Sequence, residues 1–359
     1  MDDISLMRRC IALARRACGS TSPNPMVGAI LYKDGRIIAE DYHRKAGEPH
    51  AEALVLKSAG AAAEGATLYV SLEPCCHTGK RTPPCTDAII GAKIKRVVAA
   101  MLDPNPSVSG MGLVMLKKAD IETAVGILQT QAERLNEVYI KYITTKTPFV
   151  ILKAAMTLDG KMAAPDGQSK WITCEKSRRY VHRIRSSVDA VLTAIGTVKA
   201  DNPRLTARGR GLRSPVRVCI DPSLETPLDY EILKTPPRTI IVTKEQDTGG
   251  FAPGVELIHY DGRLDLKWLM QELGQRHITS VMIEGGASLT GHAVEDGIVD
   301  KVIFFIAPKI IGGKGVYCPV SSKTFRSVET PYEVYDMRSR ALGTDIVIEG
   351  YLGYLEVNG

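Results

Sequence analysis

Cysteine crowding is the feature that most restricts how this chain folds. Three cysteines and a histidine occupy the eleven residues from Cys75 to Cys85, in the segment SLEPCCHTGKRTPPC. Such a cluster is typical of a disulfide, a metal site or a reactive thiol. The first residues, MDDISLMRRCIALARRACG, open with two acids and carry four arginines among the apolar positions, which is not the pattern of a signal peptide. We therefore expect a cytoplasmic protein with reduced thiols, and the cluster predicts a metal or catalytic site.

Composition narrows the class of protein and of partner. The 359 residues are enough for two domains, and 44% hydrophobic with 24% charged residues is typical of a globular chain. No apolar run approaches the roughly 20 residues of a membrane span, so no membrane partner is expected. The net charge of +6 is spread along the chain. It favours anionic small molecules and does not predict a nucleic-acid partner, which requires basic residues concentrated on one face.

Hydrophobic periodicity predicts an α/β protein of two domains. In the first half, Met26–Tyr32 and Arg36–Ala39 are expected to form a hairpin. The other expected elements are helices at Glu48–Ala59 (with Pro49 in its first turn), Thr86–Ile94, Val114–Lys118 and Gln131–Thr144, and strands at Thr67–Leu72, Arg96–Met101 and Ile121–Val125. The pattern restarts at Thr147-Pro148, where proline disfavours helix in the residue before it. The predicted domains are residues 1–146 and 147–359.

One histidine and two cysteines form the predicted metal site. His50, Cys75 and Cys85 give three ligands for a tetrahedral zinc ion, with the fourth position left to water. Zinc lowers the pKa of bound water to roughly 7, which makes hydroxide available at neutral pH. Cys76 and His77 are interpreted as bystanders, because adjacent side chains rarely point at one ion.

Glu52 is the expected proton carrier of this site. It follows His50 by two residues near the start of a predicted helix, where it can border the same cavity and move a proton from water to a leaving amine. His-x-Glu followed by Pro-Cys and a later cysteine is typical of zinc-dependent base deaminases. The spacing departs from that pattern, because nine residues separate Cys75 from Cys85 where two are usual.

Two other interpretations remain open at this point. A structural zinc module that binds nucleic acid would recruit Cys76 or His77 as a fourth ligand. A deaminase of tRNA or of free bases, joined to an unrelated reductase, would keep the same three ligands.

Motifs along nearly the whole chain resemble the bifunctional deaminase–reductase family of bacterial riboflavin biosynthesis. They are SPNPMVGAI at Ser22–Ile30, HRKAGEPHAEALVL at His43–Leu56, the cysteine segment, DPNP at Asp103–Pro106, LKAAMTLDGKMA at Leu152–Ala163, SKWIT at Ser169–Thr173, GTVKADNPRLTAR at Gly196–Arg208 and IEGGASLTG at Ile283–Gly291. The resemblance implies an N-terminal cytidine-deaminase-like three-layer α/β/α domain and a C-terminal dihydrofolate-reductase-like α/β domain. It also implies two cofactors, Zn²⁺ and NADPH, and a homo-oligomer, either a dimer or a tetramer.

The implied first reaction is hydrolytic deamination of 2,5-diamino-6-(5-phosphoribosylamino)pyrimidin-4(3H)-one. Matching positions imply that Asn24, His43, Asp103 and Asn105 hold the pyrimidine and the ribose phosphate. Lys80 or Arg81 is a candidate for the phosphate. Asn24 suits a ring edge, since its amide offers both a donor and an acceptor.

The implied second reaction is NADPH-dependent reduction of the ribosyl group, which gives 5-amino-6-(5-phosphoribitylamino)uracil. Matching positions imply substrate contacts at Ser169, Arg185, Leu205, Arg208 and Glu284, and NADPH contacts at Ala155, Trp171, Thr197, Asp201, Gly286, Ala287 and Ser288. Asp201 and Lys153 are the candidates for polarising or protonating the ribose. The glycines of Ile283–Gly286 are expected at a strand-to-helix turn whose amides can bind a phosphate. For Trp171, a place in the hydrophobic core is an equally typical interpretation.

Overall fold

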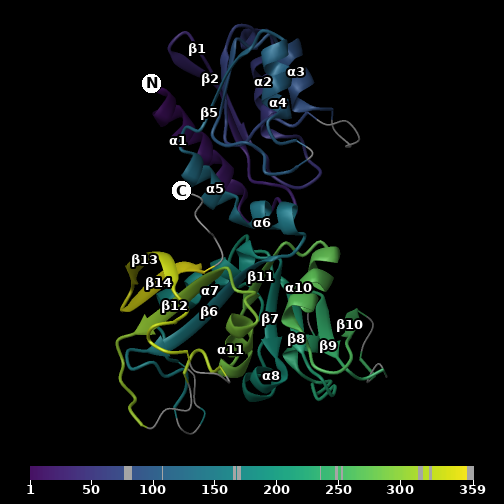
Figure 1. The fold of residues 1–359 in the computed structure, drawn as a ribbon, viewed down its shortest axis with the longest axis vertical. Coiled ribbons are helices and arrows are strands. Elements are labelled where there is room, and N and C mark those ends of the chain that lie inside the picture. The colour runs from purple at the N-terminus through teal and green to yellow at the C-terminus, as the bar shows by residue number, and fades with distance from the viewer. Residues whose placement is uncertain are drawn as a thin grey trace. The chain divides into compact units, whose positions relative to one another are not determined.

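The computed structural model describes residues 1–76, 83–106, 108–164, 167, 171–234, 236–246, 250–251, 254–313, 318–322 and 326–353. The chain forms two compact units, Met1–Lys146 and Thr147–Gly359. Each unit has its own sheet and its own buried hydrophobic core (Figure 1). No helix within the described ranges combines the length and the apolar character that a membrane span requires.

A five-stranded sheet in the order β2-β1-β3-β4-β5 organises the first unit. Its strands are β1 (Gly28–Lys33), β2 (Arg36–Tyr42), β3 (Thr67–Val70), β4 (Arg96–Ala99) and β5 (Glu122–Val125). β1 pairs antiparallel with β2 and β3, whereas β3, β4 and β5 are parallel. The expected hairpin is confirmed: Asp34 and Gly35, with φ values of 50° and 79°, form the two-residue loop that Asp-Gly favours.

Helices cover both faces of this sheet. Crossovers between parallel strands are right-handed, so α2 (Ala51–Ala59), α3 (Cys85–Gly91) and α4 (Met111–Lys118) share one face, and α1 (Asp3–Ala14) packs on the other (Figure 1). This is the expected three-layer arrangement. The helix predicted from Glu48 begins only at Ala51, so Pro49 lies before the helix.

The helix predicted over Gln131–Thr144 is wrong in one respect. The chain forms two helices, α5 (Gln129–Leu135) and α6 (Glu137–Thr145), which meet at Asn136. The buried side chain of Asn136 accepts a hydrogen bond from the backbone N–H of Met26 at 2.8 Å and donates one to its carbonyl at 3.1 Å. This tertiary contact holds Asn136 in a non-helical conformation, which local periodicity does not reveal.

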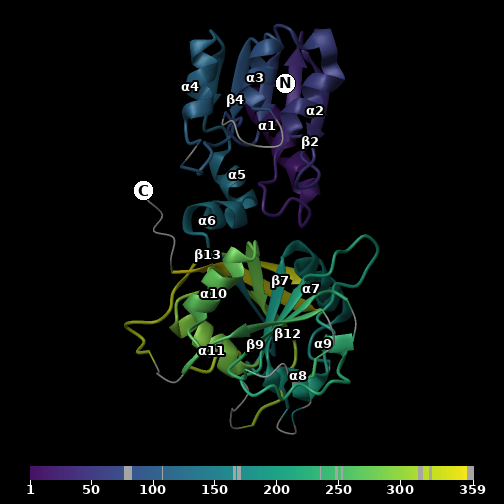
Figure 2. The ribbon, with the colours of Figure 1, turned by 90° about the vertical axis from the view of Figure 1, so that its right-hand side faces the viewer.

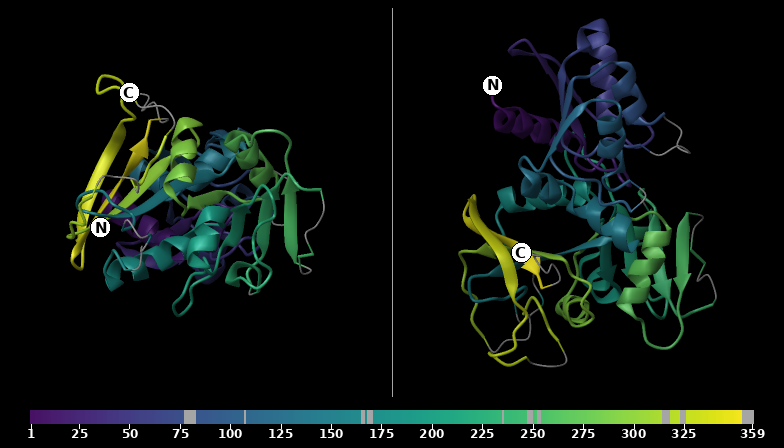
Figure 3. Two further views of the ribbon diagram at one scale, coloured as in Figure 1. Left: turned by 90° about the horizontal axis from the view of Figure 1, so that it is seen from below. Right: turned by 45° about the horizontal axis from the view of Figure 1, so that its top comes forward.

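A nine-stranded sheet in the order β10-β9-β8-β7-β11-β6-β12-β14-β13 organises the second unit. The strands are β6 (Phe149–Thr157), β7 (Ala190–Ala194), β8 (Val216–Ile220), β9 (Thr239–Thr243), β10 (Val255–His259), β11 (Ser280–Ile283), β12 (Lys301–Ala307), β13 (Val334–Leu342) and β14 (Asp345–Leu352). β6 to β12 are parallel, and the antiparallel strands β14 and β13 complete one edge (Figure 3).

The helices of this unit divide between its two faces. The chain moves toward one edge through α7 (Glu175–Ser187), α8 (Ile195–Asp201) and α9 (Glu231–Lys234), and returns through α10 (Leu266–Gln275) and α11 (Ala287–Glu295). Right-handed crossovers therefore place α7 on one face and α10 with α11 on the other (Figure 2). The carboxyl ends of β7, β11 and β6 lie side by side where the order of the strands along the chain reverses. Ligands bind at this position in open α/β sheets.

Candidate active sites

Three elements of the first unit bring the predicted metal ligands together. His50 is the N-cap residue of α2, Cys75 follows β3 and Cys85 is the first residue of α3. His50 Nδ1 lies 3.2 Å from Cys85 Sγ and 3.6 Å from Cys75 Sγ, and the three donor atoms lie within 4.8 Å of one another. Cys76 is buried but is not part of this group, and His77 lies outside the described residues.

These separations fit a zinc ion. Zn–S bonds of about 2.3 Å and Zn–N bonds of about 2.0–2.1 Å at tetrahedral angles place nitrogen and sulfur about 3.6 Å apart. Hydrogen bonding from Cys85, together with His50, lowers the pKa of the Cys75 thiol, although burial opposes its charge, and the same contact raises the pKa of Cys85. The donor set is thus the chemistry that zinc prefers, with a thiolate already favoured.

Glu52 lies in the first turn of α2 and is only 3% exposed. Burial raises the pKa of its carboxyl group, while the nearby His50 and Cys85 oppose that rise. A carboxyl group enclosed beside a zinc-type donor set is suited to accept and return a proton.

The other deaminase candidates form the surroundings of this cluster. His43 is buried, and its Nδ1 lies 3.1 Å from the carbonyl of Pro49, so this nitrogen carries the proton and donates it. Its Nε2 lies 3.3 Å from Asn24 Nδ2 and accepts from that amide. The ring also meets His50 edge-on, with centroids 5.5 Å apart. His43 therefore orients Asn24 and supports His50.

Asp103 and Asn105 lie on the loop after β4. Asp103 Oδ1 accepts from the Tyr139 hydroxyl and from the backbone N–H of Asn105, both at 2.9 Å. Lys80, a further candidate, lies outside the described residues.

Sequence reasoning missed Glu73, which anchors this loop. Its buried carboxylate accepts backbone N–H groups from Asp103, Gly110, Gly112 and Leu113 at 2.9–3.3 Å. Its position two residues before Cys75 in the cysteine segment was the available signal.

A cavity of about 1360 Å³ lies in the second unit at the carboxyl ends of β6, β7, β8 and β11. Twelve predicted residues line it: Lys153, Ala155, Trp171, Arg185, Thr197, Asp201, Leu205, Arg208, Glu284, Gly286, Ala287 and Ser288. Ser169 lies outside the described residues. Trp171 is not a core residue, because it is 66% exposed, and the Arg178 guanidinium lies 4.5 Å from its ring.

A buried ion cluster forms one wall of this cavity. Glu284, directly after β11, binds Arg185 through both carboxylate oxygens at 2.8 Å and lies 3.2 Å from Lys153 Nζ. Burial opposes the charge of Glu284, yet Arg185 and Lys153 lower its pKa strongly. The cluster therefore holds the Lys153 side chain at a fixed place in the wall.

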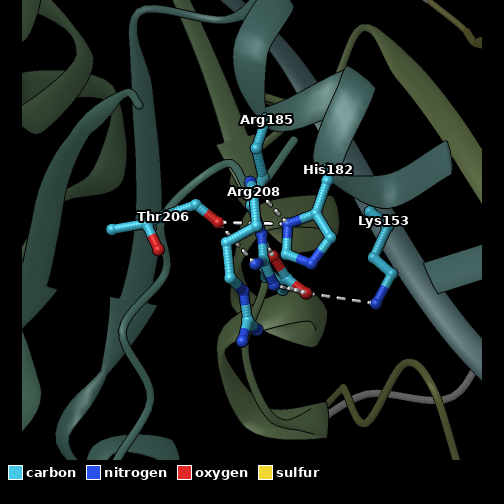
Figure 4. Close-up of polar contacts among 6 residues, drawn as sticks. Lys153, His182, Arg185, Thr206 and Arg208 are labelled. Atoms are coloured by element: carbon cyan, nitrogen blue, oxygen red, sulfur yellow. Dashed lines mark hydrogen bonds and ion pairs between the residues drawn. The ribbon is translucent and has the colours of Figure 1, made fainter. Parts of the chain in front are cut away.

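The loop with Leu205 and Arg208 is tied to the same cluster. Arg185 Nη1 donates to the carbonyl of Thr206 at 3.0 Å (Figure 4). His182 also contacts this loop and lines the cavity, and sequence reasoning missed it. It precedes Arg185 by three residues, so the helical periodicity of α7 placed both on one face.

The turn after β11 matches its prediction. Gly286 is the N-cap residue of α11, and Gly286, Ala287 and Ser288 face the cavity. A Cβ atom at Gly286 would lie 3.7 Å from Thr197 Oγ1. The predicted NADPH residues at the start of α11 therefore lie beside Thr197, another predicted NADPH residue.

Comparisons with known proteins match both halves of the chain. The family model of the cytidine and deoxycytidylate deaminase zinc-binding region matches residues 1–101, and that of the RibD C-terminal domain matches residues 148–348. The riboflavin biosynthesis protein RibD of Aquifex aeolicus is 43% identical over 351 residues, which cover 96% of this chain and 97% of that protein. That of Actinobacillus pleuropneumoniae is 41% identical over 358 residues, with 97% and 95% covered.

Solved structures agree over the whole length. RibD of Acinetobacter baumannii in form 1 has a TM-score of 0.90 at 37% identity, covering 98% of this chain and 99% of that one. The diaminohydroxyphosphoribosylaminopyrimidine deaminase/5-amino-6-(5-phosphoribosylamino)uracil reductase of Thermotoga maritima has a TM-score of 0.88 at 39% identity, with 98% of each chain covered. With both halves matched and full-length relatives sharing its fold, this chain belongs to the RibD family, the bifunctional deaminase–reductases of riboflavin biosynthesis.

Proposed function

We propose that residues 1–146 deaminate 2,5-diamino-6-(5-phosphoribosylamino)pyrimidin-4(3H)-one and that residues 147–359 reduce the ribosyl group of the product to ribityl. One observation carries the first half of this proposal. A buried carboxyl group, that of Glu52, lies beside a three-donor group with the composition of a catalytic zinc site.

His50, Cys75 and Cys85 would hold the zinc ion, which supplies the Lewis acidity that makes water nucleophilic at neutral pH. Glu52 takes a proton from the attacking water and delivers it to the departing 2-amino group, so that one water is consumed and one ammonia is released. Asn24, oriented by His43, reads the ring edge, and the loop with Asp103 and Asn105 encloses the ribose phosphate.

In the second unit, NADPH supplies the hydride. Gly286, Ala287 and Ser288 at the start of α11 bind a cofactor phosphate, since a helix N-terminus presents free N–H groups. Lys153, held by Glu284, is the proposed proton donor to the ribose, and Asp201 at the end of α8 is the alternative.

Arg208 is the proposed phosphate-binding residue of the reductase substrate. Its guanidinium has no ion-pair partner within the described residues, whereas Arg185 is engaged by Glu284. A free planar guanidinium suits bidentate phosphate binding. Arg185 then acts by fixing Glu284 and the Thr206 carbonyl.

We further propose a cytoplasmic homo-oligomer, either a dimer or a tetramer. The exposed apolar side chains on edge strand β13, Tyr335 at 52% and Met337 at 64%, support an association surface there. Sedimentation velocity of the full chain measures this directly, and a monomer at micromolar concentration would contradict it.

Incubating the full chain with the diaminopyrimidine phosphate, with and without NADPH, tests the reaction order. Ammonia is expected without NADPH, and NADPH oxidation is expected only after ammonia appears. Glu52→Gln should keep one zinc per chain but lose ammonia release by at least a hundredfold, the lower end of what general acid–base catalysis contributes. Glu64→Gln, at an exposed carboxylate of the same unit, is the matched control. Full ammonia release from the Glu52 variant would reject the proposed mechanism.

A further inference from the structure

His182 is a cavity residue for which the proposed reaction gives no role. It lies on α7, half-buried in the wall of the second-unit cavity. Its Nδ1 lies 3.2 Å from the carbonyl oxygen of Thr206 and 3.3 Å from the backbone nitrogen of Arg208. Figure 4 shows the ring facing the loop through this one nitrogen.

These two contacts make opposite demands on Nδ1, because a carbonyl accepts only and a backbone N–H donates only. The Thr206 carbonyl has Arg185 Nη1 as a donor at 3.0 Å, whichever nitrogen of His182 carries the proton. The Arg208 N–H, by contrast, has no other hydrogen-bond acceptor within the described residues. A protonated Nδ1 would leave that N–H unpaired, so Nδ1 accepts and the proton lies on Nε2. Burial, followed by the charges of Arg185 and Arg208, lowers the pKa of His182, which is consistent with a neutral ring.

The hydrogen bond to His182 fixes the backbone of Arg208. The Arg208 side chain is left without an ion-pair partner among the described residues. The preceding residues of the loop are fixed through Arg185. Lys153, Arg185 and Arg208 carry three positive charges against the one negative charge of Glu284, so this side of the cavity suits a dianionic phosphate.

We propose that His182 is a positioning residue for the substrate phosphate: its unprotonated Nδ1 accepts the backbone N–H of Arg208 and so fixes where the Arg208 guanidinium meets the phosphate. The inference rests on the proposed phosphate role of Arg208. Specificity for the phosphorylated substrate would then depend in part on His182, a residue with a neutral side chain.

The test compares two isosteric replacements in the full chain. Asparagine places an acceptor oxygen near the position of Nδ1, whereas glutamine places its amide near Nε2 and leaves the Arg208 N–H unpaired. With 5-amino-6-(5-phosphoribosylamino)uracil and NADPH, His182→Gln should raise KM about tenfold with kcat within about threefold. His182→Asn should raise KM about threefold or less, as expected for one hydrogen bond kept or lost.

Two further measurements separate positioning from a general structural effect. His182→Gln should add nothing to the KM of Arg208→Ala, because it acts through Arg208. With the dephosphorylated substrate, the difference between the two His182 variants should vanish. Arg183→Gln, at an exposed neighbour on α7, is the matched control, and fluorescence of Trp171 and Trp268, which both belong to the second unit, reports that each variant is folded.

Three results decide the matter. Equal KM values for the asparagine and glutamine variants, or effects of His182→Gln and Arg208→Ala that multiply, would overturn the inference alone. An Arg208→Ala variant with unchanged KM would remove the phosphate role of Arg208 and the inference with it. An unmodified chain that oxidises no NADPH would instead contradict the proposed function.

Discussion

At the scale of single residues, the carboxylate of Glu284 is a buried charge that joins two basic side chains in the second unit. Its side chain is 17% exposed, and those of Arg185 and Lys153 are 12% and 13% exposed. Removing one partner of a buried ion pair costs about 3–5 kcal/mol, because the remaining charges stay buried without compensation.

Glu284→Gln should therefore destabilise the second unit by about 3 kcal/mol at pH 7. Both tryptophans, Trp171 and Trp268, belong to this unit, so tryptophan fluorescence during urea unfolding reports on it selectively. Glu225→Gln, in a pair with Lys199 that is about half exposed, is the control and should change stability by less than about 1 kcal/mol. Equal losses in both variants would show that burial of the Glu284 ion cluster does not contribute the expected stability.

The same pair of variants gives a pH dependence. The folded-state pKa of Glu284 is lowered, so its stabilisation is fully present above the unfolded pKa of about 4.3 and is lost as pH falls toward the folded value. The difference in unfolding free energy between wild type and Glu284→Gln should be constant from pH 8 to pH 5 and smaller at pH 3. A difference that grows on acidification would show that Glu284 is not ionised in the folded state.

At the scale of elements, α4 is attached to the metal site through its second residue. A Cβ atom at Gly112 would lie 2.3 Å from the carbonyl oxygen of Pro74 and 3.1 Å from Glu73 Oε1. Glycine thus lets α4 approach the segment that carries Cys75, and the Glu73 carboxylate then binds the helix N-terminus.

Gly112→Ala should weaken this attachment, although alanine is the better helix former. We expect a loss of about 1–3 kcal/mol in the stability of the first unit and a higher KM for deamination, because α4 must move away from Pro74. The measurement is thermal inactivation of ammonia release, with tryptophan fluorescence showing an unchanged second unit. Gly91→Ala, in α3 with nothing within 4 Å of the added Cβ, should be neutral or slightly stabilising. A neutral Gly112 variant would contradict this account.

At the scale of the whole molecule, the two units have separate cores and separate chemistry. Removing zinc with a chelator should abolish ammonia release and leave NADPH oxidation intact when the deaminated intermediate is supplied, since the predicted zinc ligands all belong to the first unit. Parallel assays of both activities before and after zinc is restored check this expectation. Loss of both activities on chelation would show that the second unit also depends on the metal.

The chemistry of the chain was predictable from sequence because short motifs, such as His-x-Glu and Pro-Cys, contain the reactive residue types. His50 caps α2, Cys75 lies in the segment after β3 and Cys85 begins α3, so the pattern of His-x-Glu, Pro-Cys and a later cysteine was enough to group them. The reductase residues were carried over from matching positions of the family that the chain resembles, and twelve of them line one cavity.

The contacts that only tertiary structure decided join residues far apart in the chain through buried polar groups. Asn136 divides a predicted helix by bonding to Met26. Glu73 binds backbone N–H groups 30 to 40 residues later in the chain. Glu284, directly after β11, joins Lys153 of β6 to Arg185 of α7. Local periodicity records which face of an element is apolar, but a buried polar group takes its partner from whatever the fold brings within 3 Å. The sequence by itself predicted the two α/β units, the zinc donors and the cofactor-binding turn, whereas the tertiary structure decided how those groups are held and charged.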